Sequence, residues 1–340
     1  MKKHYLYLAT IFFLSGLCLL LMIFLSRQIK QQFPDIKQQD SNQTGRVLLT
    51  LYPTSAPTPT PSLISLVFAG DAMFDRHIRQ NAQEKGNYDF ILADLESFFS
   101  TSDLVIINLE GPLTDYPSVS VNTVPGSSKN YIFTFDPLVA TTLKNQNILL
   151  VNLGNNHILN FGEDGLQQTY LNLEKNGVNY FGNPGPESEA EKRIFYFQKN
   201  DFVIAFVNYN QFVSGGEKTA LDDIQLARSS ADFVILYTHW GNEYQPNANQ
   251  VIVNQAHKFI DVGVDLIIGS HPHVIQNVET YKNKTIYYSL GNFVFDQYFS
   301  TETKQGLVVK ATLNPLNKQI SFEEVVVEMS KDGRTSQMIE

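Results

Sequence analysis

Short apolar runs alternate along residues 63–340 with segments whose apolar positions recur every three to four residues. The runs are rich in β-branched and aromatic residues and predict strands. These strands are expected at 63–69, 103–108, 148–152, 202–208, 232–238, 264–268, 284–289, 305–312 and 320–328. The periodic segments predict helices at 88–99, 137–146, 163–176, 219–229 and 247–262. Strands alternate with helices first and follow one another later, which predicts a mixed α/β (α+β) sandwich flanked by helices.

The amino-terminal part has a different pattern. Residues 5–25 carry no charge, and at 1.5 Å per residue such a segment spans a bilayer core of about 30 Å. No small-X-small cleavage pattern follows it, so an uncleaved transmembrane anchor is expected after a cytoplasmic tail at 1–4. Residues 26–62 are rich in Gln, Pro and Thr and predict a linker. The organisation predicts a single-pass membrane protein whose domain, 63–340, lies outside the cytoplasm.

Composition narrows the function classes. The net charge is −9 and the pI is near 5.3, so the chain lacks the basic surface that nucleic acid requires. It contains neither GxxxxGK[ST] nor GxGxxG, so nucleotide binding of those kinds has no support. A serine hydrolase is also not indicated, because the GxSxG elbow is missing.

Polar side chains cluster directly after five of the predicted strands. In open α/β sheets the loops beyond the strand carboxyl ends converge and carry the ligand-binding groups. Each residue alone also has an ordinary interpretation, as a helix cap, a solvated turn residue or a core histidine with a bonded ring. The clustered residues are Asp71, Glu110, Asn155, Asn156, His157, His239, His271 and His273. Their recurrence at five strand ends predicts one metal-binding rim, since imidazoles and carboxylates are common metal ligands.

The blocks around these residues resemble the CapA family of bacterial capsule and poly-γ-glutamate synthesis proteins. The blocks are GDAMFDR (70–76), NLEGPLT (108–114), GNNH (154–157), HWGNEY (239–244), GSHPHVIQ (269–276) and YSLGNFVFDQ (288–297). That family in turn resembles the calcineurin-like metallophosphoesterases. The resemblance implies a four-layer β-sandwich flanked by helices, with loops that hold one or two divalent ions, most often Mn, Fe or Zn.

The resemblance also implies a role for each residue of the rim. Asp71 would be the first-strand carboxylate, and Glu110 would bridge two metals. Asn156, His239 and His271 would then bind one ion, and His273 would complete the other. His157 would stand at the open face as an acid or an electrostatic stabiliser.

Two positions depart from the pattern. Phosphoesterases place a histidine two residues after the first aspartate, where this chain has Met73, whose thioether is a poor ligand for hard ions. The first ion is therefore expected to be weakly held or absent. CapA-type sequences often carry an aspartate three residues after the histidine of the GNNH block, where this chain has Asn160, a weaker support for a charged His157.

Three further residues are predicted to contact substrate: Arg76, Asn155 and Glu243. Arg76 would clamp an anionic group bidentately, or it would pair with Asp75 or another neighbour. Glu243 would support His239 or carry a proton, or it is an exposed loop acid. Asp296 is expected to brace neighbouring loops.

Taken together, the residues and the resemblance predict a membrane-anchored CapA-like protein of capsule, poly-γ-glutamate or related envelope polymer synthesis. The expected activity is metal-dependent hydrolysis or transfer on an anionic polymer, in company with other membrane-bound synthesis proteins. The alternative is a non-catalytic polymer-handling or assembly subunit that keeps the fold, which the substitutions Met73 and Asn160 favour. Fold resemblance does not choose between a phosphodiester, a γ-glutamyl amide and a sugar-linked polymer.

Overall fold

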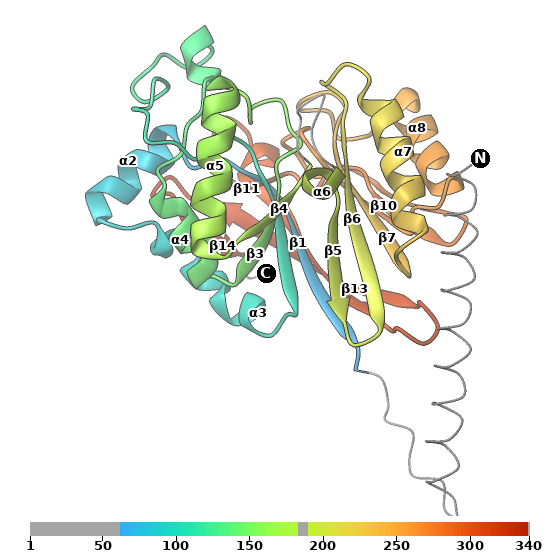
Figure 1. Ribbon diagram of the computed structural model, residues 1–340. Coiled ribbons are helices and arrows are strands. Elements are labelled where there is room, and N and C mark those ends of the chain that lie inside the picture. The colour runs from blue at the N-terminus through green and yellow to red at the C-terminus, as the bar shows by residue number, and fades with distance from the viewer. Residues whose placement is uncertain (1–61, 183–189, 339–340) are drawn as a thin grey trace, which may run out of the picture. The chain divides into compact units, whose positions relative to one another are not determined.

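The computed structural model describes residues 62–182 and 190–338. Within these ranges two β-sheets pack face to face, and helices cover the outer face of each (Figure 1). The predicted α/β sandwich is thus confirmed. The predicted transmembrane segment 5–25 and nearly all of the linker lie outside the described residues, and none of the described helices is long and apolar enough to cross a bilayer.

The first sheet has eight strands among the described residues, and its strands β1 to β4, up to one edge, run parallel. Its other edge is antiparallel, because β12 pairs with β1 and β13 pairs with β12 in that sense. In spatial order the strands are β14 (Thr335–Gln337), β13 (Ile320–Met329), β12 (Gln305–Leu313), β1 (Ile64–Ala72), β2 (Leu104–Leu109), β3 (Ile148–Asn152) and β4 (Asn179–Phe181). A short strand, β11 (Asn292–Val294), pairs with the end of β1 outside this order.

The second sheet has six strands within the described part of the chain. Four of them run parallel, and the two edge strands β5 and β9 are antiparallel to their neighbours. The spatial order is β5 (Phe195–Lys199), β6 (Phe202–Asn210), β7 (Phe233–His239), β8 (Leu266–Ser270), β10 (Lys284–Tyr287) and β9 (Val278–Tyr281). The nine strands predicted from the sequence are all present, with ends shifted by a few residues.

The alternation of side chains along the strands divides the core into layers. Leu66 and Phe68 of β1 pack between the sheets with Phe206 of β6 and Ile235 of β7. Val67, the residue between them, faces the helices instead. Because successive side chains of a strand point to opposite faces, strands that are buried on both faces need the near-continuous apolar runs seen in the sequence.

Helices of eight or more residues cover both outer faces. On the first sheet lie α2 (Arg76–Lys85), α4 (Leu138–Asn145) and α5 (Gly162–Asn176), and on the second α7 (Gly216–Arg228) and α8 (Gln250–Asp261) (Figure 1). A short α6 (Ala190–Arg193) precedes β5. Four of the five predicted helices are confirmed. The sequence analysis missed α2, since its composition is largely polar.

The prediction of one helix at 88–99 was wrong. The segment forms two 3₁₀ turns, Asp89–Ile91 and Ala93–Leu95, followed by the short α3 (Glu96–Ser100). Most of its apolar residues are buried, as the spacing indicated, but none of the three turns has a side-chain N-cap. Without such caps the amide groups at a helix start are left without partners, which favours short turns over a continuous helix.

The carboxyl ends of the parallel strands of both sheets meet at one rim. Asp71 of β1 pairs in register with Asn108 of β2, and His239 of β7 pairs with Ser270 of β8. The approach is tight at Gly70, where a β-carbon would lie 1.9 Å from the carbonyl oxygen of Gly291. A side chain at this position would separate β1 from the segment that leads into β11.

Candidate metal centre

Asp71 lies at the middle of the rim and is completely buried. Its carboxylate accepts hydrogen bonds from Asn108 Nδ2 at 2.7 Å and from the backbone N–H of His271 at 3.0 Å. Its Oδ2 is 3.3 Å from His273 Nδ1. Burial raises the pKa of Asp71, but the hydrogen bond and charge of His273 outweigh it and hold the pKa below its usual range. Asp71 is therefore an anion at neutral pH.

Glu110 is completely buried, and neither oxygen of its carboxylate has a hydrogen-bond partner. The nearest basic atoms are His273 Nε2 at 3.7 Å and His157 Nε2 at 3.8 Å. Burial, and after it the charge of Asp71, raises the pKa of Glu110 well above its usual value. A buried carboxylate without a partner is costly, and a bound cation is the ordinary way to compensate for it.

His239 and His271 bring nitrogen atoms together beside these carboxylates. Ser270 Oγ donates to the Thr238 carbonyl at 2.7 Å, so it accepts from His239 Nδ1 at 3.1 Å. That bond leaves Nε2 of His239 with its lone pair, 3.2 Å from His271 Nδ1 and 2.9 Å from Oδ1 of Asn156. Three atoms of the kinds that ligate metals thus converge on one point.

The turn that carries His271 and His273 has an unusual backbone. Both residues have positive φ, 96° and 57°, which non-glycine residues rarely adopt. Both are buried, their rings lie 5.9 Å apart, and Nδ1 of His273 is 2.9 Å from Oδ1 of Asn292. The left-handed residues turn both imidazoles inward, and strain of this kind concentrates at functional sites.

Ligand-type atoms form two groups, each with all atoms within 4.8 Å of one another. One contains Asp71, Glu110 and His239, and the other contains His271, His273 and Glu243. His239 therefore lies beside the carboxylates as well as beside Asn156 and His271, and Glu243, which the resemblance did not name as a ligand, joins the second group. The residues present suit divalent cations, since they combine carboxylates with imidazoles around the unpartnered Glu110.

His157 faces the rim from its open side. Asn160 Oδ1 accepts from the Phe133 backbone N–H at 2.7 Å, which identifies that atom as the oxygen. His157 Nδ1, 3.1 Å away, must then be the donor, so Nε2 is unprotonated and points toward Glu110. Burial lowers the pKa of His157 to about 4. In this state His157 accepts a proton at Nε2 rather than donating one.

Met73 is completely buried, and its Sδ accepts a hydrogen bond from the backbone N–H of Asp75. The sulfur is therefore engaged within its own turn, as expected of a position that does not bind a hard ion. Asp75 is held by Ser120 and Thr134 as well, at 2.8 and 2.9 Å. Met73, which stands where phosphoesterases have a histidine, is thus part of a packed turn at the end of β1.

The three residues predicted to contact substrate lie in different surroundings, and their roles stay predictions. Arg76 forms a buried ion pair with Asp296, which braces the loops as expected. The Arg76 side chain does not pair with Asp75, which accepts the Arg76 backbone N–H instead. Asn155 is buried, donating to the Leu109 carbonyl at 2.8 Å and accepting from the His157 backbone N–H. Glu243 is exposed at the mouth of the rim.

The sequence analysis did not single out two amides that hold the ligand-type residues in place. Asn108 donates to Asp71 and packs beside the His239 ring, and Asn292 accepts from His273 Nδ1 through its Oδ1. Both are completely buried. A polar residue inside an apolar strand run, such as Asn108 in LVIINL, is the sequence signal that marks them, because a buried amide requires partners.

We expect acidification to destabilise the metal-free protein. Burial lowers the pKa of His157 to about 4 and that of His271 to about 3, and the pKa of His239 lies well below its usual value for the same reason. These imidazoles stay neutral in the folded chain but bind protons in the unfolded chain below about pH 6.5. Their contribution to stability is complete above that pH and falls as the pH approaches the folded value. For His157 the loss is about 2 kcal/mol between roughly pH 7 and pH 5.

The raised pKa of Glu110 acts in the opposite direction, because the folded chain keeps a proton that the unfolded chain releases above its usual value of 4.5. One carboxyl does not offset three imidazoles, so urea unfolding in the presence of chelator should give a lower free energy of unfolding at the acidic pH. The variant His157→Gln should lose about 2 kcal/mol less on acidification. An equal loss in both proteins would contradict this assignment.

Comparison with known proteins adds an independent observation. Residues 65–297 match the family described as "Bacterial capsule synthesis protein PGA_cap". The chain is 31% identical over 266 residues to the PGA biosynthesis protein CapA of Bacillus subtilis, covering 74% of this chain and 68% of that protein. It is 29% identical over 267 residues to the capsule biosynthesis protein CapA of Bacillus anthracis, covering 73% of this chain and 63% of that protein.

Among solved structures, the fold is similar to a 5'-nucleotidase from Candida albicans. The TM-score is 0.43 with 14% identity, and the match covers 79% of this chain and 52% of that chain. A likeness at this level carries no functional inference.

Proposed function

Because this chain belongs to the PGA_cap family of bacterial capsule synthesis proteins, we propose that it helps to make an anionic cell-envelope polymer as a metal-dependent hydrolase or transferase. The names of the two Bacillus relatives support the polymer, and the buried cluster supports the reaction type. The chain spans 68% and 63% of those relatives' lengths, so the activity of the whole relatives does not transfer by similarity alone.

One or two divalent ions would be held by the six buried or rim residues named from the sequence. When bound, such ions polarise a phosphoryl or carbonyl oxygen and lower the pKa of a bound water. Manganese, iron and zinc suit the mixture of imidazole, carboxylate and amide donors. The ligands are Asp71, Glu110, Asn156, His239, His271 and His273.

His157 would act as the proton acceptor of the site. Its Nε2 carries the lone pair, its Nδ1 is fixed by Asn160, and its ring packs 4.3 Å from that of Phe133. Because Asn160 is neutral, it orients the ring but adds no charge that would favour the imidazolium form. A proton taken up at Nε2 would then pass readily to a leaving group.

We also propose that the domain works at the outer surface of a membrane. Residues 5–25 would anchor it, and the linker at 26–62 would separate the domain from the bilayer. Other membrane-bound proteins of polymer synthesis are the expected partners. A cysteine-accessibility assay on intact cells, with single cysteines on either side of residues 5–25, tests this orientation.

The unpartnered carboxylate of Glu110 is the observation that carries the metal-dependent function. After purification without chelator, elemental analysis should find about one or two equivalents of Mn, Fe or Zn per chain. Hydrolysis of bis(p-nitrophenyl) phosphate or of an oligo-γ-glutamate should stop on chelation and return with Mn²⁺. The variant His239→Ala should lower both metal content and rate by at least about a hundredfold.

His257 provides the matched control, since it lies on α8 and pairs with Glu279 at 2.7 Å, away from the rim. The variant His257→Ala should keep the metal and the rate. If the purified protein contains no metal and binds none on titration, the proposed function is wrong.

The alternative of a non-catalytic assembly subunit is favoured by one feature, the buried and engaged thioether of Met73 at a position where phosphoesterases have a ligand. Complementation separates the two functions. If His157→Ala and His239→Ala proteins fold and fully restore envelope polymer in a deletion strain, the subunit function holds. Loss of polymer with both variants supports catalysis.

A further inference from the structure

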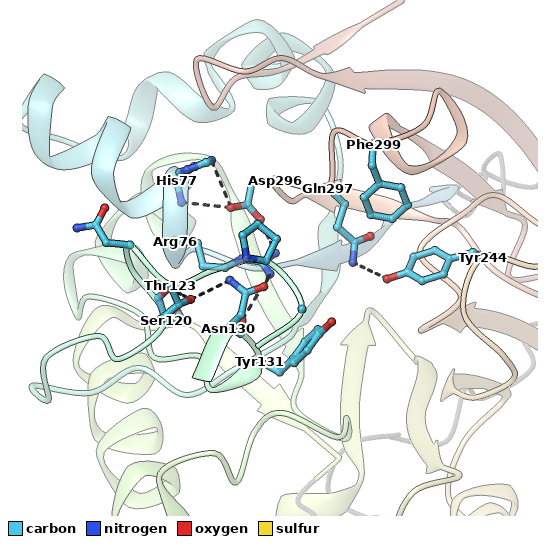
Figure 2. Close-up of a pocket in the computed structure, with 13 residues that line it drawn as sticks. Arg76, His77, Ser120, Thr123, Asn130, Tyr131, Tyr244, Asp296, Gln297 and Phe299 are labelled. Atoms are coloured by element: carbon cyan, nitrogen blue, oxygen red, sulfur yellow. Dashed lines mark hydrogen bonds and ion pairs between the residues drawn. The ribbon is translucent and has the colours of Figure 1, made fainter. Parts of the chain in front are cut away.

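A cavity of about 180 Å³, shown in Figure 2, is lined by none of the proposed metal ligands, and Tyr244 of its lining lies near His273. Arg76 and Asp296 lie among its lining residues, and three aromatic side chains, Tyr131, Tyr244 and Phe299, surround it. The volume is below the roughly 300–1,000 Å³ of pockets that hold drug-sized ligands. The cavity therefore suits a single monosaccharide-sized unit.

The cavity and the metal centre share a wall. Phe133 and Phe295 contact residues of both: Arg76 Cζ, which lines the cavity, lies 5.1 and 5.3 Å from their ring centres. The ring of Phe295 also lies 4.8 Å from that of His273. Tyr244 of the cavity lies 6.2 Å from His273 between ring centres.

A chain of hydrogen bonds also links the two places. Gln297 Nε2 donates to the Tyr244 hydroxyl at 3.1 Å, and its Oε1 accepts from Asn292 Nδ2 at 3.2 Å. Asn292 in turn contacts His273 through Oδ1. A group held in the cavity would therefore lie next to whatever reacts at the centre.

The charges of the cavity compensate one another. The Arg76 guanidinium pairs with Asp296, and its other amino group donates to Asn130 Oδ1 at 3.2 Å. The remaining basic lining residue, His77, is mostly exposed and lies 3.9 Å from the same Asp296 carboxylate. Among the described lining residues no lysine or second arginine is present to receive an anion.

The aromatic side chains at the opening are unusually exposed for their size. Tyr131, Tyr244 and Phe299 are 48%, 40% and 67% accessible. Tyr244 and Phe299 meet edge to face with centres 5.3 Å apart. Exposed aromatic surface beside a polar cavity offers flat apolar area without conformational cost, and such rings commonly contact ligands.

We propose that this cavity binds an uncharged pyranose ring of the polymer, beside the group that reacts at the metal centre. The proposal rests on the proposed function and names its substrate class: a glycan in which a neutral sugar adjoins an anionic linkage. The flat C–H face of a pyranose packs on aromatic rings. Its hydroxyls suit the amides of Asn130 and Gln297, which each keep one N–H and one oxygen lone pair beyond their present bonds, and the Thr123 oxygen, which can still accept.

An oligo-γ-glutamate fits the same cavity poorly. Every residue of that polymer carries a carboxylate, which would approach Asp296 and Glu243 without an unpaired cation to receive it. Desolvating a carboxylate without such a partner is unfavourable. The same argument applies to a phosphate in the cavity, so the anionic linkage belongs at the metal centre.

Saturation-transfer NMR and calorimetry on the full chain test the inference. The probes are a panel of uncharged oligosaccharides built from hexoses and N-acetylhexosamines, together with an oligo-γ-glutamate of similar length. At least one oligosaccharide should bind, and Tyr244→Ala and Phe299→Ala should each weaken that binding about tenfold. Tyr244→Phe should keep most of it, because the ring remains.

Tyr196 is the matched control, since it is also 40% exposed but lies on β5 at the far edge of the second sheet. The variant Tyr196→Ala should bind as the wild type does. The inference is overturned if no oligosaccharide of the panel binds, or if Tyr244→Ala and Phe299→Ala both bind the oligosaccharide as well as the wild type does. It is also overturned if the oligo-γ-glutamate binds in place of the sugars and these two variants weaken its binding.

These experiments distinguish a failure of the proposed sugar site from a failure of the proposed metal-dependent function. Metal content and hydrolysis of the small phosphodiester are measured on the wild-type protein, and sugar binding is measured both with metal and in chelator. Sugar binding without any metal or hydrolysis would refute the proposed function but not the sugar site. Metal-dependent hydrolysis without sugar binding would refute the sugar site alone.

Discussion

Replacing Glu110 with glutamine is expected to remove metal binding and, in the metal-free protein, to increase stability. The carboxylate is completely buried and unpartnered, and its pKa is raised well above the usual value by burial and by Asp71. The folded metal-free chain must therefore either bury a charge or take up a proton at neutral pH. An amide avoids that cost, and we expect a gain of about 2 kcal/mol.

The same substitution removes the ligand that lies within 4 Å of both His157 and His273. Metal affinity should fall by more than the roughly 10–100-fold that loss of an outer partner costs. Calorimetric titration with Mn²⁺ and urea unfolding in chelator measure the two effects. A change of opposite sign in the two experiments is characteristic of a group kept for function at the expense of stability.

Glu84 is the control, because it is an exposed carboxylate on α2. The variant Glu84→Gln should change the free energy of unfolding by less than about 0.5 kcal/mol and leave metal affinity unchanged. If Glu110→Gln is less stable than the wild type in chelator, or if it retains its metal, the interpretation of Glu110 as a metal ligand is wrong.

The variant Asp296→Ala is expected to lose about 3–5 kcal/mol of stability. Arg76 is 9% exposed and lies between the rings of Phe133 and Phe295, and its guanidinium stays charged at every accessible pH. Without Asp296 this charge would be buried with only Asn130 as a partner. The backbone N–H of His77 would also lose its acceptor at 3.2 Å.

Urea unfolding of two further proteins makes this prediction specific. The double variant Arg76→Met with Asp296→Leu should recover most of the lost stability, because no uncompensated charge remains. Asp222→Ala breaks an exposed ion pair with Lys218, whose side chains are 58% and 81% accessible, and should cost less than about 1 kcal/mol. A loss for Asp296→Ala as small as that for Asp222→Ala would show that the buried pair contributes little.

The strands were predictable because their signal is local. A strand buried on both faces, such as β7 or β8, needs a continuous apolar run, which is visible in a handful of consecutive letters. The segment 88–99 shows the limit of such patterns. Its apolar spacing indicated burial correctly, but the choice between one helix and three short turns depended on capping and packing partners elsewhere in the chain.

For the candidate site, the sequence also predicted which residues meet but not all of their partners. Parallel strands bring their carboxyl ends to one edge, so polar residues after each apolar run were expected to meet, and Asp71 does lie beside His239 and His273. The sequence gives no sign of the partner of Arg76, because Asp296 is 220 residues away and reaches it only through β11 and its following loop. Asn292, which positions His273, was missed for the same reason.

The sequence by itself determined the family of the chain and the candidate residues for its chemistry, since both follow from residue types in local runs. Only the tertiary structure showed how those residues are arranged. It showed that Glu110 has no hydrogen-bond partner, that His239 lies beside the carboxylates, and that a cavity with aromatic lining and compensated charges lies nearby. The physical reason is that burial and electrostatic compensation depend on distances between segments far apart in the chain. No local pattern records those distances.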